Sequence, residues 1–114
     1  MKSKYKNIPH IIDGIKFQSK KEANRYSELK LLQKAGIIKY FNCQPTFLLQ
    51  DGYKKKDGKI VRPIMYIADF EIFYPDGHCE VEDVKSPGTI TQVFRIKRKL
   101  LEMQYPEINF KLVL

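Results

Sequence analysis

Apolar side chains recur at helical spacing in two segments of this chain, and the first segment has clear signals at both ends. Residues 19–36 read SKKEANRYSELKLLQKAG. Ser19 is followed three residues later by Glu22, which is the capping-box signature of a helix N-terminus. Gly36, with Lys34 in the preceding turn, is typical of a helix C-terminus. The pattern predicts an α-helix over these residues.

The second helical segment covers residues 91–105 and stops at Pro106, which cannot continue a helix. Its aliphatic side chains fall on one side, which we expect to be the buried face. The residues of this expected face are Val93, Ile96, Leu100 and Met103.

Alternating apolar and polar side chains predict the strands. Residues 10–17 read as a short hairpin around Asp13 and Gly14. The other predicted strands are residues 44–50, 60–74, the run after a turn at 74–78, and residues 108–114. Residues 51–59 read as a polar turn, and Pro63 predicts a bend or a sheet edge. The order is helix, three strands, helix and strand, so we expect an α/β or α+β fold with one mixed central sheet.

The turn in MYIADFEIFYPDGHCEVEDVKS, residues 65–86, determines which side chains meet. Pro75 at the second turn position and Gly77 where a positive φ is needed predict a three-residue hairpin loop. The expected pairs are Tyr74 with His78, Phe70 with Glu82, Asp69 with Asp83, and Ile67 with Lys85. Two aspartates would then face each other across the hairpin.

Opposed carboxylates lie about 5 Å apart and repel unless a cation separates them. Mg²⁺ prefers oxygen ligands and is typically held by one or two carboxylates, so Asp69 and Asp83 are a candidate metal site. Lys85 follows on the same face and can orient a water or stabilise charge on a phosphate. The alternatives are that Asp69 is a solvated strand residue and that Asp83 and Lys85 form an exposed ion pair.

A third acid comes from the first helix. Glu22 lies in the middle of the apolar arc formed by Ala23, Tyr26, Leu29 and Leu32, so we expect it to point at the sheet. A purely structural role, as the reciprocal member of a capping box with Ser19, explains Glu22 as well. Both interpretations stay open. We expect Glu80 and Glu82, on the opposite strand face from Asp83, to be solvated, and Glu82 is the alternative metal ligand if a bulge shifts the strand.

The charge balance favours a polyanionic partner. The 114 residues include 21 Lys and Arg against 13 Asp and Glu, for a net charge of +8. Nucleic acid fits this charge better than a membrane surface, because no segment is long and apolar enough to span a bilayer. Two cysteines without metal-ligand spacing argue against a zinc site or disulfide framework. We expect one domain over residues 1–114 with a flexible basic segment at 1–10, no small-molecule cofactor, and a cytoplasmic location.

The ordered acids resemble a known nuclease superfamily. An acid on a first helix, an acid on a strand and a D-x-K motif on the next strand, followed by a helix, is the pattern of the PD-(D/E)XK nucleases. The segments FQSKKEANRYSELKLLQKAGIIKYFNCQPTFLL, YIADFEIFYPDG and EDVKSPGTITQVFRIKRKLL look like small phage-encoded proteins assigned to that superfamily. The similarity runs from Ile15 onward. Ala68 stands where the superfamily often has proline, which is not a metal ligand.

The resemblance implies a restriction-endonuclease-like core and assigns roles residue by residue. Glu22, Asp69, Asp83 and the carbonyl of Val84 would hold the metal, and Lys85 would be the catalytic lysine. The implied activity is Mg²⁺-dependent DNA cleavage, with Mn²⁺ as a substitute, that leaves a 5′-phosphate. The closest analogy is to phage enzymes that resolve Holliday junctions or cut branched DNA in recombination, which commonly act as homodimers in the host cytoplasm.

Two groups of basic residues are candidate DNA-backbone contacts. They are Lys54, Lys55 and Lys56 in the polar turn, and Arg95, Lys97, Arg98 and Lys99 on the second helix. The alternative for the turn lysines is simple solvation. A non-catalytic nucleic-acid-binding module and an RNA-directed nuclease of the same fold are the competing functional interpretations.

Overall fold

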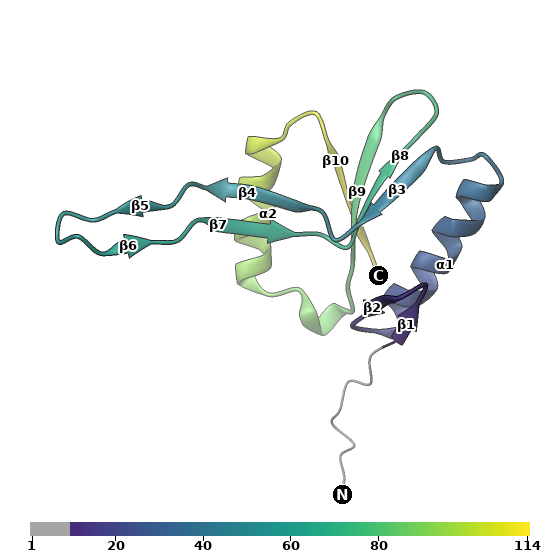
Figure 1. Cartoon of the computed structure of the whole chain (residues 1–114), viewed down its shortest axis with the longest axis horizontal. Helices are drawn as coiled ribbons and strands as arrows, with labels where there is room; N and C mark the ends of the chain where they lie inside the picture. The colour runs from purple at the N-terminus through teal and green to yellow at the C-terminus, as the bar shows by residue number, and fades with distance from the viewer. Residues whose placement is uncertain (1–9) are drawn as a thin grey trace, which may run out of the picture.

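The computed structural model describes residues 10–114, so the basic segment predicted over residues 1–10 lies outside the described residues except for His10. The elements in chain order are β1 (His10–Ile12), β2 (Ile15–Phe17), α1 (Lys20–Lys34), β3 (Tyr40–Cys43), β4 (Thr46–Gln50), β5 (Tyr53–Lys54), β6 (Ile60–Val61), β7 (Ile64–Ile67), β8 (Phe70–Phe73), β9 (Cys79–Val84), the 3₁₀ turn η1 (Pro87–Thr89), α2 (Gln92–Gln104) and β10 (Asn109–Val113) (Figure 1). The predicted mixture of helices and strands is confirmed.

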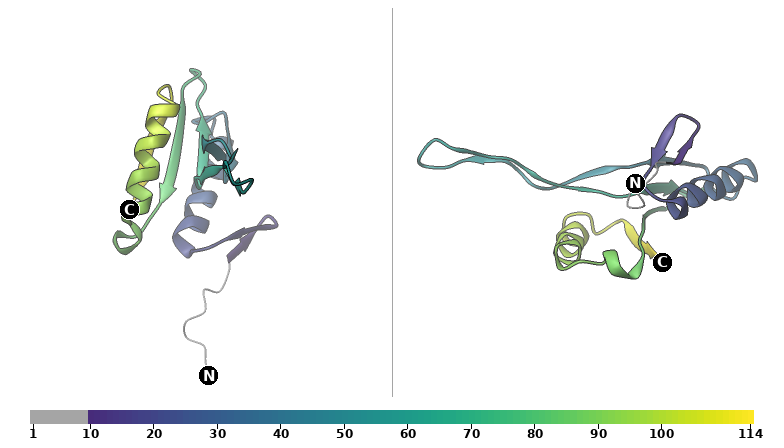
Figure 2. Two further views of the ribbon diagram at one scale, coloured as in Figure 1. Left: turned by 90° about the vertical axis from the view of Figure 1, so that its left-hand side faces the viewer. Right: turned by 90° about the horizontal axis from the view of Figure 1, so that it is seen from below.

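Four strands form the central sheet in the order β10-β9-β8-β3. β8 runs antiparallel to both β3 and β9, whereas β10 is parallel to β9, so the sheet is mixed as predicted. α1 and α2 lie on opposite sides of this sheet (Figure 2, left). The parallel β10 follows α2, which provides the crossover connection that a parallel strand needs.

Each helix packs on its own apolar cluster. The cluster under α1 comprises Phe17, Ala23, Tyr26, Leu29, Ile38, Phe70 and Ile72. The cluster under α2 comprises Phe47, Leu49, Tyr66, Ala68, Val81 and Leu101. Phe70 and Ile72 of β8 therefore face one helix, and Val81 of the neighbouring β9 faces the other, as the alternation of side chains along strands requires.

Both ends of α1 form as the sequence predicts. The Ser19 hydroxyl accepts a hydrogen bond from the Glu22 backbone N–H at 3.1 Å. At the other end Gly36 has a φ of 79°, and the N–H of Ile37 donates to the Leu32 carbonyl at 3.0 Å. This left-handed glycine terminus satisfies carbonyls that the last helical turn leaves free. No helix among residues 10–114 is long and apolar enough to cross a membrane.

The predicted buried face of α2 is wrong at three of its four residues. Val93, Ile96 and Met103 are 63%, 53% and 72% exposed, and the fully buried residue is Leu101. Leu100, the fourth predicted residue, does pack in the cluster under α2, together with Phe94, Leu101 and Tyr105. The helix carries two apolar stripes, and on the buried one the Phe94 ring lies beside Tyr66, while Tyr105 at the end of the helix lies beside Phe47. The periodicity does not distinguish the stripes, because both repeat at helical spacing.

A two-stranded ribbon, residues 46–67, leaves the central sheet and extends away from the body of the molecule (Figure 1). Its inner half is the pair β4 and β7 and its outer half the pair β5 and β6. The predicted polar turn is the tip of this ribbon, and Pro63 separates β6 from β7. Gly52 lies against the Val61–Pro63 segment, and a Cβ atom added at Gly52 would come within 2.7 Å of the Val61 carbonyl oxygen.

The ribbon is continuous with the central sheet. Between the β3–β8 pair and the β4–β7 pair, the Gln44 N–H donates to the Asp69 carbonyl at 2.8 Å and the Ala68 N–H donates to the Pro45 carbonyl at 3.0 Å. Gln44 has a φ of 54°, which marks a break in the strand. The sequence reading missed the separate β3, because this break divides one extended segment into two short strands.

Candidate functional site

The acids predicted from the sequence gather where the ribbon joins the central sheet. Glu22 lies in the first turn of α1, Asp69 in the bend between β7 and β8, and Asp83 near the end of β9. Glu22 and Asp83 are each only 6% exposed. Burying carboxylates to this degree is costly without a compensating partner, so their surroundings decide their chemistry.

The predicted hairpin register holds from the turn to the middle of the strands. The Tyr74 N–H donates to the His78 carbonyl at 3.0 Å, and Phe70 faces Glu82. The Asp69 N–H then donates to the Glu82 carbonyl at 3.1 Å, so Asp69 and Phe70 both oppose one residue of β9. This is a β-bulge, and it ends the ladder. The predicted pairs that are not formed are Asp69 with Asp83 and Ile67 with Lys85.

The bulge changes the direction in which Asp69 points. Ala68 packs in the cluster under α2 and Phe70 in the cluster under α1, although residues two apart in a regular strand share a face. One carboxylate oxygen of Asp69, Oδ2, accepts a hydrogen bond from the Val84 N–H at 2.6 Å. Burial raises the pKa of the Asp69 carboxyl, while the Val84 N–H and the charge of Lys85 oppose that rise.

Glu22 is the nearest carboxyl partner of Asp69. Burial is the main cause that raises the pKa of Glu22 from 4.5 to about 7, and the charge of Asp69 is the next. A hydrogen bond between the two carboxyls contributes, and the charge of Asp83 adds a smaller effect. Only the Ser19 half of the predicted capping box is present: within residues 10–114, no hydrogen bond from the Ser19 N–H to the Glu22 carboxylate accompanies it. The Glu22 side chain points at the sheet, as predicted.

Asp83 lies on the side of the sheet that faces α2. Burial raises the pKa of its carboxyl to about 6, against the charge of Lys85, the Asp69 N–H and the charge of Arg98. The Lys85 ammonium lies 4.9 Å from the centre of the Phe94 ring on α2. The structure thus brings Glu22 and Asp69 together directly and places Asp83 next to them with Lys85 between the sheet and α2.

A cavity of about 420 Å³ opens beside this cluster. Its lining includes Ser19, Lys21, Glu22, Asp69, Val84 and Lys85. Asp83 does not line it. Among residues 10–114, no group of three or more His, Cys, Asp or Glu side chains has the arrangement of a metal site. The carboxylates that line this cavity are those of Glu22 and Asp69.

The ion pair between Arg25 and Glu82 is a feature that sequence reasoning missed. Glu82 is buried, not solvated as expected, with 1% of its surface exposed. Arg25 donates from Nε to Glu82 Oε1 at 2.8 Å and from a terminal nitrogen to Oε2 at 2.6 Å, and it also pairs with Glu28. Arg25 lies three residues after Glu22, so this fork fixes the turn of α1 that carries the candidate acid. The sequence did contain a signal for this burial. Glu82 is predicted to pair with Phe70, and directly paired residues share a face of the sheet, so a buried Phe70 implies a buried Glu82.

One protein family matches the chain along almost its whole length. The match covers residues 2–114, and the description of that family is "Protein of unknown function (DUF1064)". The chain belongs to the DUF1064 family. The comparisons with curated proteins and with solved structures gave no match. Membership in DUF1064 assigns no activity, so the chemistry has to be argued from the residues.

The candidate DNA-contacting residues of this DUF1064 protein differ in whether their side chains are already bound within the protein. Lys97 donates to the Met65 carbonyl at 3.2 Å, and Arg98 donates to the Phe110 carbonyl at 2.7 Å, so both hold α2 on the sheet. Arg95 and Lys99 are exposed on the outer side of α2. Lys54, Lys55 and Lys56 are exposed at the ribbon tip. The tip and the outer side of α2 are therefore the basic surfaces open to a partner.

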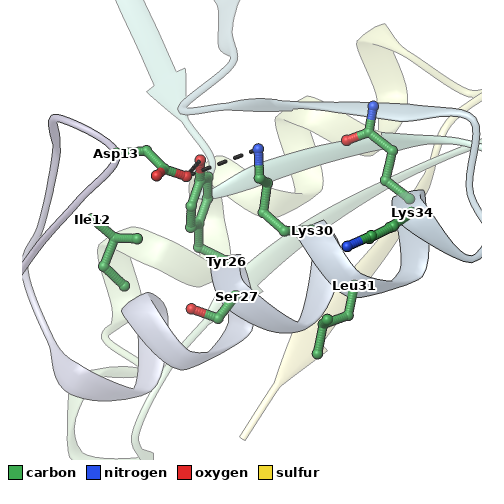
Figure 3. A pocket seen from close by; sticks show the side chains of 8 residues that line it. Ile12, Asp13, Tyr26, Ser27, Lys30, Leu31 and Lys34 are labelled. Carbon is green, nitrogen blue, oxygen red and sulfur yellow. Dashed lines mark hydrogen bonds and ion pairs between the residues drawn. The ribbon is translucent and has the colours of Figure 1, made fainter.

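A larger cavity, of about 630 Å³, lies elsewhere, between the β1–β2 turn and α1 (Figure 3). Tyr26 donates a hydrogen bond to Asp13 Oδ2 at 2.7 Å, and the Lys30 ammonium lies 3.8 Å from the same oxygen. These three side chains point toward one another in Figure 3 and satisfy one another's charge and hydrogen bonds. Their contacts fasten the hairpin to α1, which is a structural role.

The raised pKa of Glu22 makes the stability of the metal-free DUF1064 protein pH-dependent. A carboxyl with a higher pKa in the folded state holds its proton while the unfolded chain releases it, so stability is lost as pH rises from 4.5 to about 7. We expect the Tm in EDTA, measured by calorimetry, to fall across this interval. Glu22→Gln removes the titrating group and should flatten the upper part of the curve. A wild-type Tm that is level or rising across the interval contradicts the arrangement described.

Proposed function

We propose that this DUF1064 protein is a metal-dependent endonuclease that hydrolyses phosphodiester bonds in DNA. The observation that carries the proposal is the meeting of Glu22 and Asp69 at the bulge, beside a cavity that Lys85 also lines. Burial and, next, the charge of Asp69 disfavour the charged form of Glu22 and raise its pKa. Perturbed acids of this kind, together with a lysine at a cavity, are typical of functional sites rather than of structural ones.

The order of elements supports a restriction-endonuclease-like core. α1 precedes β3, β8 and β9 of the central sheet, and α2 and β10 follow them. This is the helix, three strands, helix and strand order that the resemblance to PD-(D/E)XK nucleases implies. The ribbon is an extension inserted between β3 and β8.

The candidate ligand atoms are oxygens, the atom type that Mg²⁺ prefers. Glu22 and Asp69 offer carboxylate oxygens and Val84 a carbonyl oxygen, and Mg²⁺ is commonly held by one or two carboxylates with waters completing its shell. Asp83, next to Asp69 and with a raised pKa of its own, is the third candidate ligand. When bound, Mg²⁺ or Mn²⁺ supplies Lewis-acid stabilisation of the phosphate and activation of a water.

The residues of the chain have separate roles in this scheme. Asp69 is held by the Val84 N–H through one oxygen, which leaves its other oxygen for a ligand. Lys85 lines the cavity and stabilises negative charge on a scissile phosphate. Lys21 donates to the Lys85 carbonyl at 3.3 Å and lines the same cavity, so a second ammonium stands at its entrance.

The net charge of +8 supports a nucleic-acid substrate. The resemblance to phage enzymes extends the proposal to branched DNA such as Holliday junctions, to a homodimer that cuts two strands, and to the cytoplasm of an infected host. These extensions rest on analogy with the superfamily.

A cleavage assay tests the proposal. The full chain is incubated with Mg²⁺, Mn²⁺ or EDTA and with labelled four-way junction, forked, single-stranded and duplex DNA, and with duplex RNA. We expect cleavage of branched DNA with either metal and none in EDTA, with 5′-phosphate ends on the products. Absence of cleavage on every DNA substrate with both metals contradicts the proposal, and cleavage of RNA alone favours the RNA-directed alternative.

A non-catalytic nucleic-acid-binding module is the second candidate. It is favoured by one observation, that residues 10–114 contain no group of three side chains arranged to hold a metal. Calorimetric titration with Mn²⁺ separates the candidates, because the module would bind DNA but not the ion.

A further inference from the structure

The outer half of the ribbon concentrates cations far from the acids. Residues 51–62 include five basic side chains and two acidic ones. The basic residues, all exposed, are Lys54, Lys55, Lys56, Lys59 and Arg62. Ten to twelve extended residues separate the tip from the bulge at Asp69, and at about 3.3 Å per residue this is roughly 35 Å. Figure 1 shows the ribbon extending sideways from the sheet along this length.

These cations have no partners within the part of the chain that the structure describes. The ion pairs of residues 10–114 lie elsewhere, on α1, α2, the β8–β9 turn and the β9–β10 pair. Asp57, one of the two acids of this segment, accepts a hydrogen bond from the Lys59 N–H at 3.0 Å and so stabilises the turn. The positive charge of the tip is left for something outside the chain.

Two of the lysines face each other directly. The Lys55 N–H donates to the Lys59 carbonyl at 2.8 Å across the ribbon, and Gly58 closes the turn with a φ of 89°. Like charges opposed on neighbouring strands destabilise a ribbon. Charged residues, lysine especially, also keep exposed strand edges from pairing with other chains, which accounts for part of this charge. A polyanionic partner would account for the excess of cations.

We propose that the tip of the ribbon enters the major groove of double-stranded DNA while the acid cluster contacts the same duplex about one helical turn away. The proposal takes DNA as its partner from the proposed function and adds the form of the DNA and its position. A two-stranded ribbon has the width that the major groove of B-form DNA admits, whereas the major groove of duplex RNA is too narrow. The ribbon length of roughly 35 Å equals one turn of B-form DNA.

A binding measurement with a matched control tests this inference. The variant Lys55→Gln/Lys56→Gln/Lys59→Gln is compared with Lys16→Gln/Lys34→Gln/Lys39→Gln, which removes the same charge from exposed positions on β2, at the end of α1 and before β3. Fluorescence anisotropy with a labelled DNA duplex of about 30 base pairs, in EDTA, gives the Kd at several salt concentrations. We expect the ribbon variant to lose about 10- to 100-fold in affinity and the slope of log K against log salt to fall by about 2 to 3. The control variant should lose only a few-fold.

Measuring the Tm of the variants shows whether a loss of DNA affinity comes from lost contacts or from an unfolded protein. Removing the opposed lysines relieves repulsion, so the ribbon variant should keep or raise the wild-type Tm. Duplex RNA of the same sequence should bind more weakly and respond to both variants alike. Equal losses of DNA affinity in the two variants, or a ribbon effect as large on RNA as on DNA, overturn the inference. Because the measurement is made without metal, these outcomes are independent of whether the protein cleaves DNA.

Discussion

Asp83→Asn is expected to reduce DNA cleavage by about a thousandfold. Under the proposed function, the change keeps the size of the side chain and removes a charge that would help to hold the metal, whose stabilisation of the reacting phosphate is worth several kcal/mol. A loss of about 4 kcal/mol corresponds to roughly a thousandfold in rate. The measurement is the single-turnover rate on the best substrate of the cleavage assay, at saturating Mg²⁺.

Stability and a second acid serve as controls for this variant. Because burial raises the pKa of Asp83 to about 6, the folded protein bears a disfavoured charge at neutral pH, and the Tm of Asp83→Asn should equal or exceed that of the wild type. Glu71→Gln, on β8 and outside the cavity, should cleave normally. Undiminished cleavage by Asp83→Asn removes this residue from the site, and the metal would then depend on Glu22 and Asp69.

Arg25→Ala is expected to have the largest effect on stability. It leaves the Glu82 carboxylate buried without its fork of two hydrogen bonds, and breaking a buried pair from one side typically costs about 3–5 kcal/mol. Chemical denaturation monitored by circular dichroism measures the loss. The exposed partner gives the contrast, since Glu28→Gln removes only a surface contact of Arg25 and should cost less than about 1 kcal/mol.

The double variant Arg25→Met/Glu82→Leu distinguishes a charge effect from a packing effect. Replacing both members of a buried pair by apolar side chains is often neutral for stability, so the double variant should recover most of the free energy lost in Arg25→Ala. Recovered stability with impaired cleavage would identify the pair as the device that orients Glu22. Additive destabilisation in the double variant contradicts this account of the pair.

The sequence was sufficient to predict those features that depend on a few neighbouring residues. The ends of α1 follow from Ser19 and Gly36, and the register of β8 against β9 follows from the Pro75–Gly77 turn as far as Phe70. The buried face of α2 was wrong because two stripes share one period, and only the tertiary contacts of Leu101 decide between them. The division of β3 from β4 depends on the positive φ of Gln44, for which the sequence has no strong signal.

The acids were identified by their order along the chain, and the way they meet was not predictable from it. The regular ladder predicted Asp69 opposite Asp83, and the bulge turned Asp69 toward Glu22. A bulge bends its strand and increases the local twist, and this one stands where the ribbon leaves β3 and β8. The burial of Glu82 was missed for a related reason, because a strand face that looks polar can be covered by one arginine from a helix.

The bend at Asp69 has a mechanical consequence. The Asp69 carbonyl accepts from Gln44 at the root of the ribbon, its N–H binds the Glu82 carbonyl, and its carboxylate binds the Val84 N–H. A torque applied to the distant tip is therefore transmitted through the peptide groups that orient this carboxylate. We therefore expect a partner that deflects the tip to change the angle at which Asp69 meets Glu22.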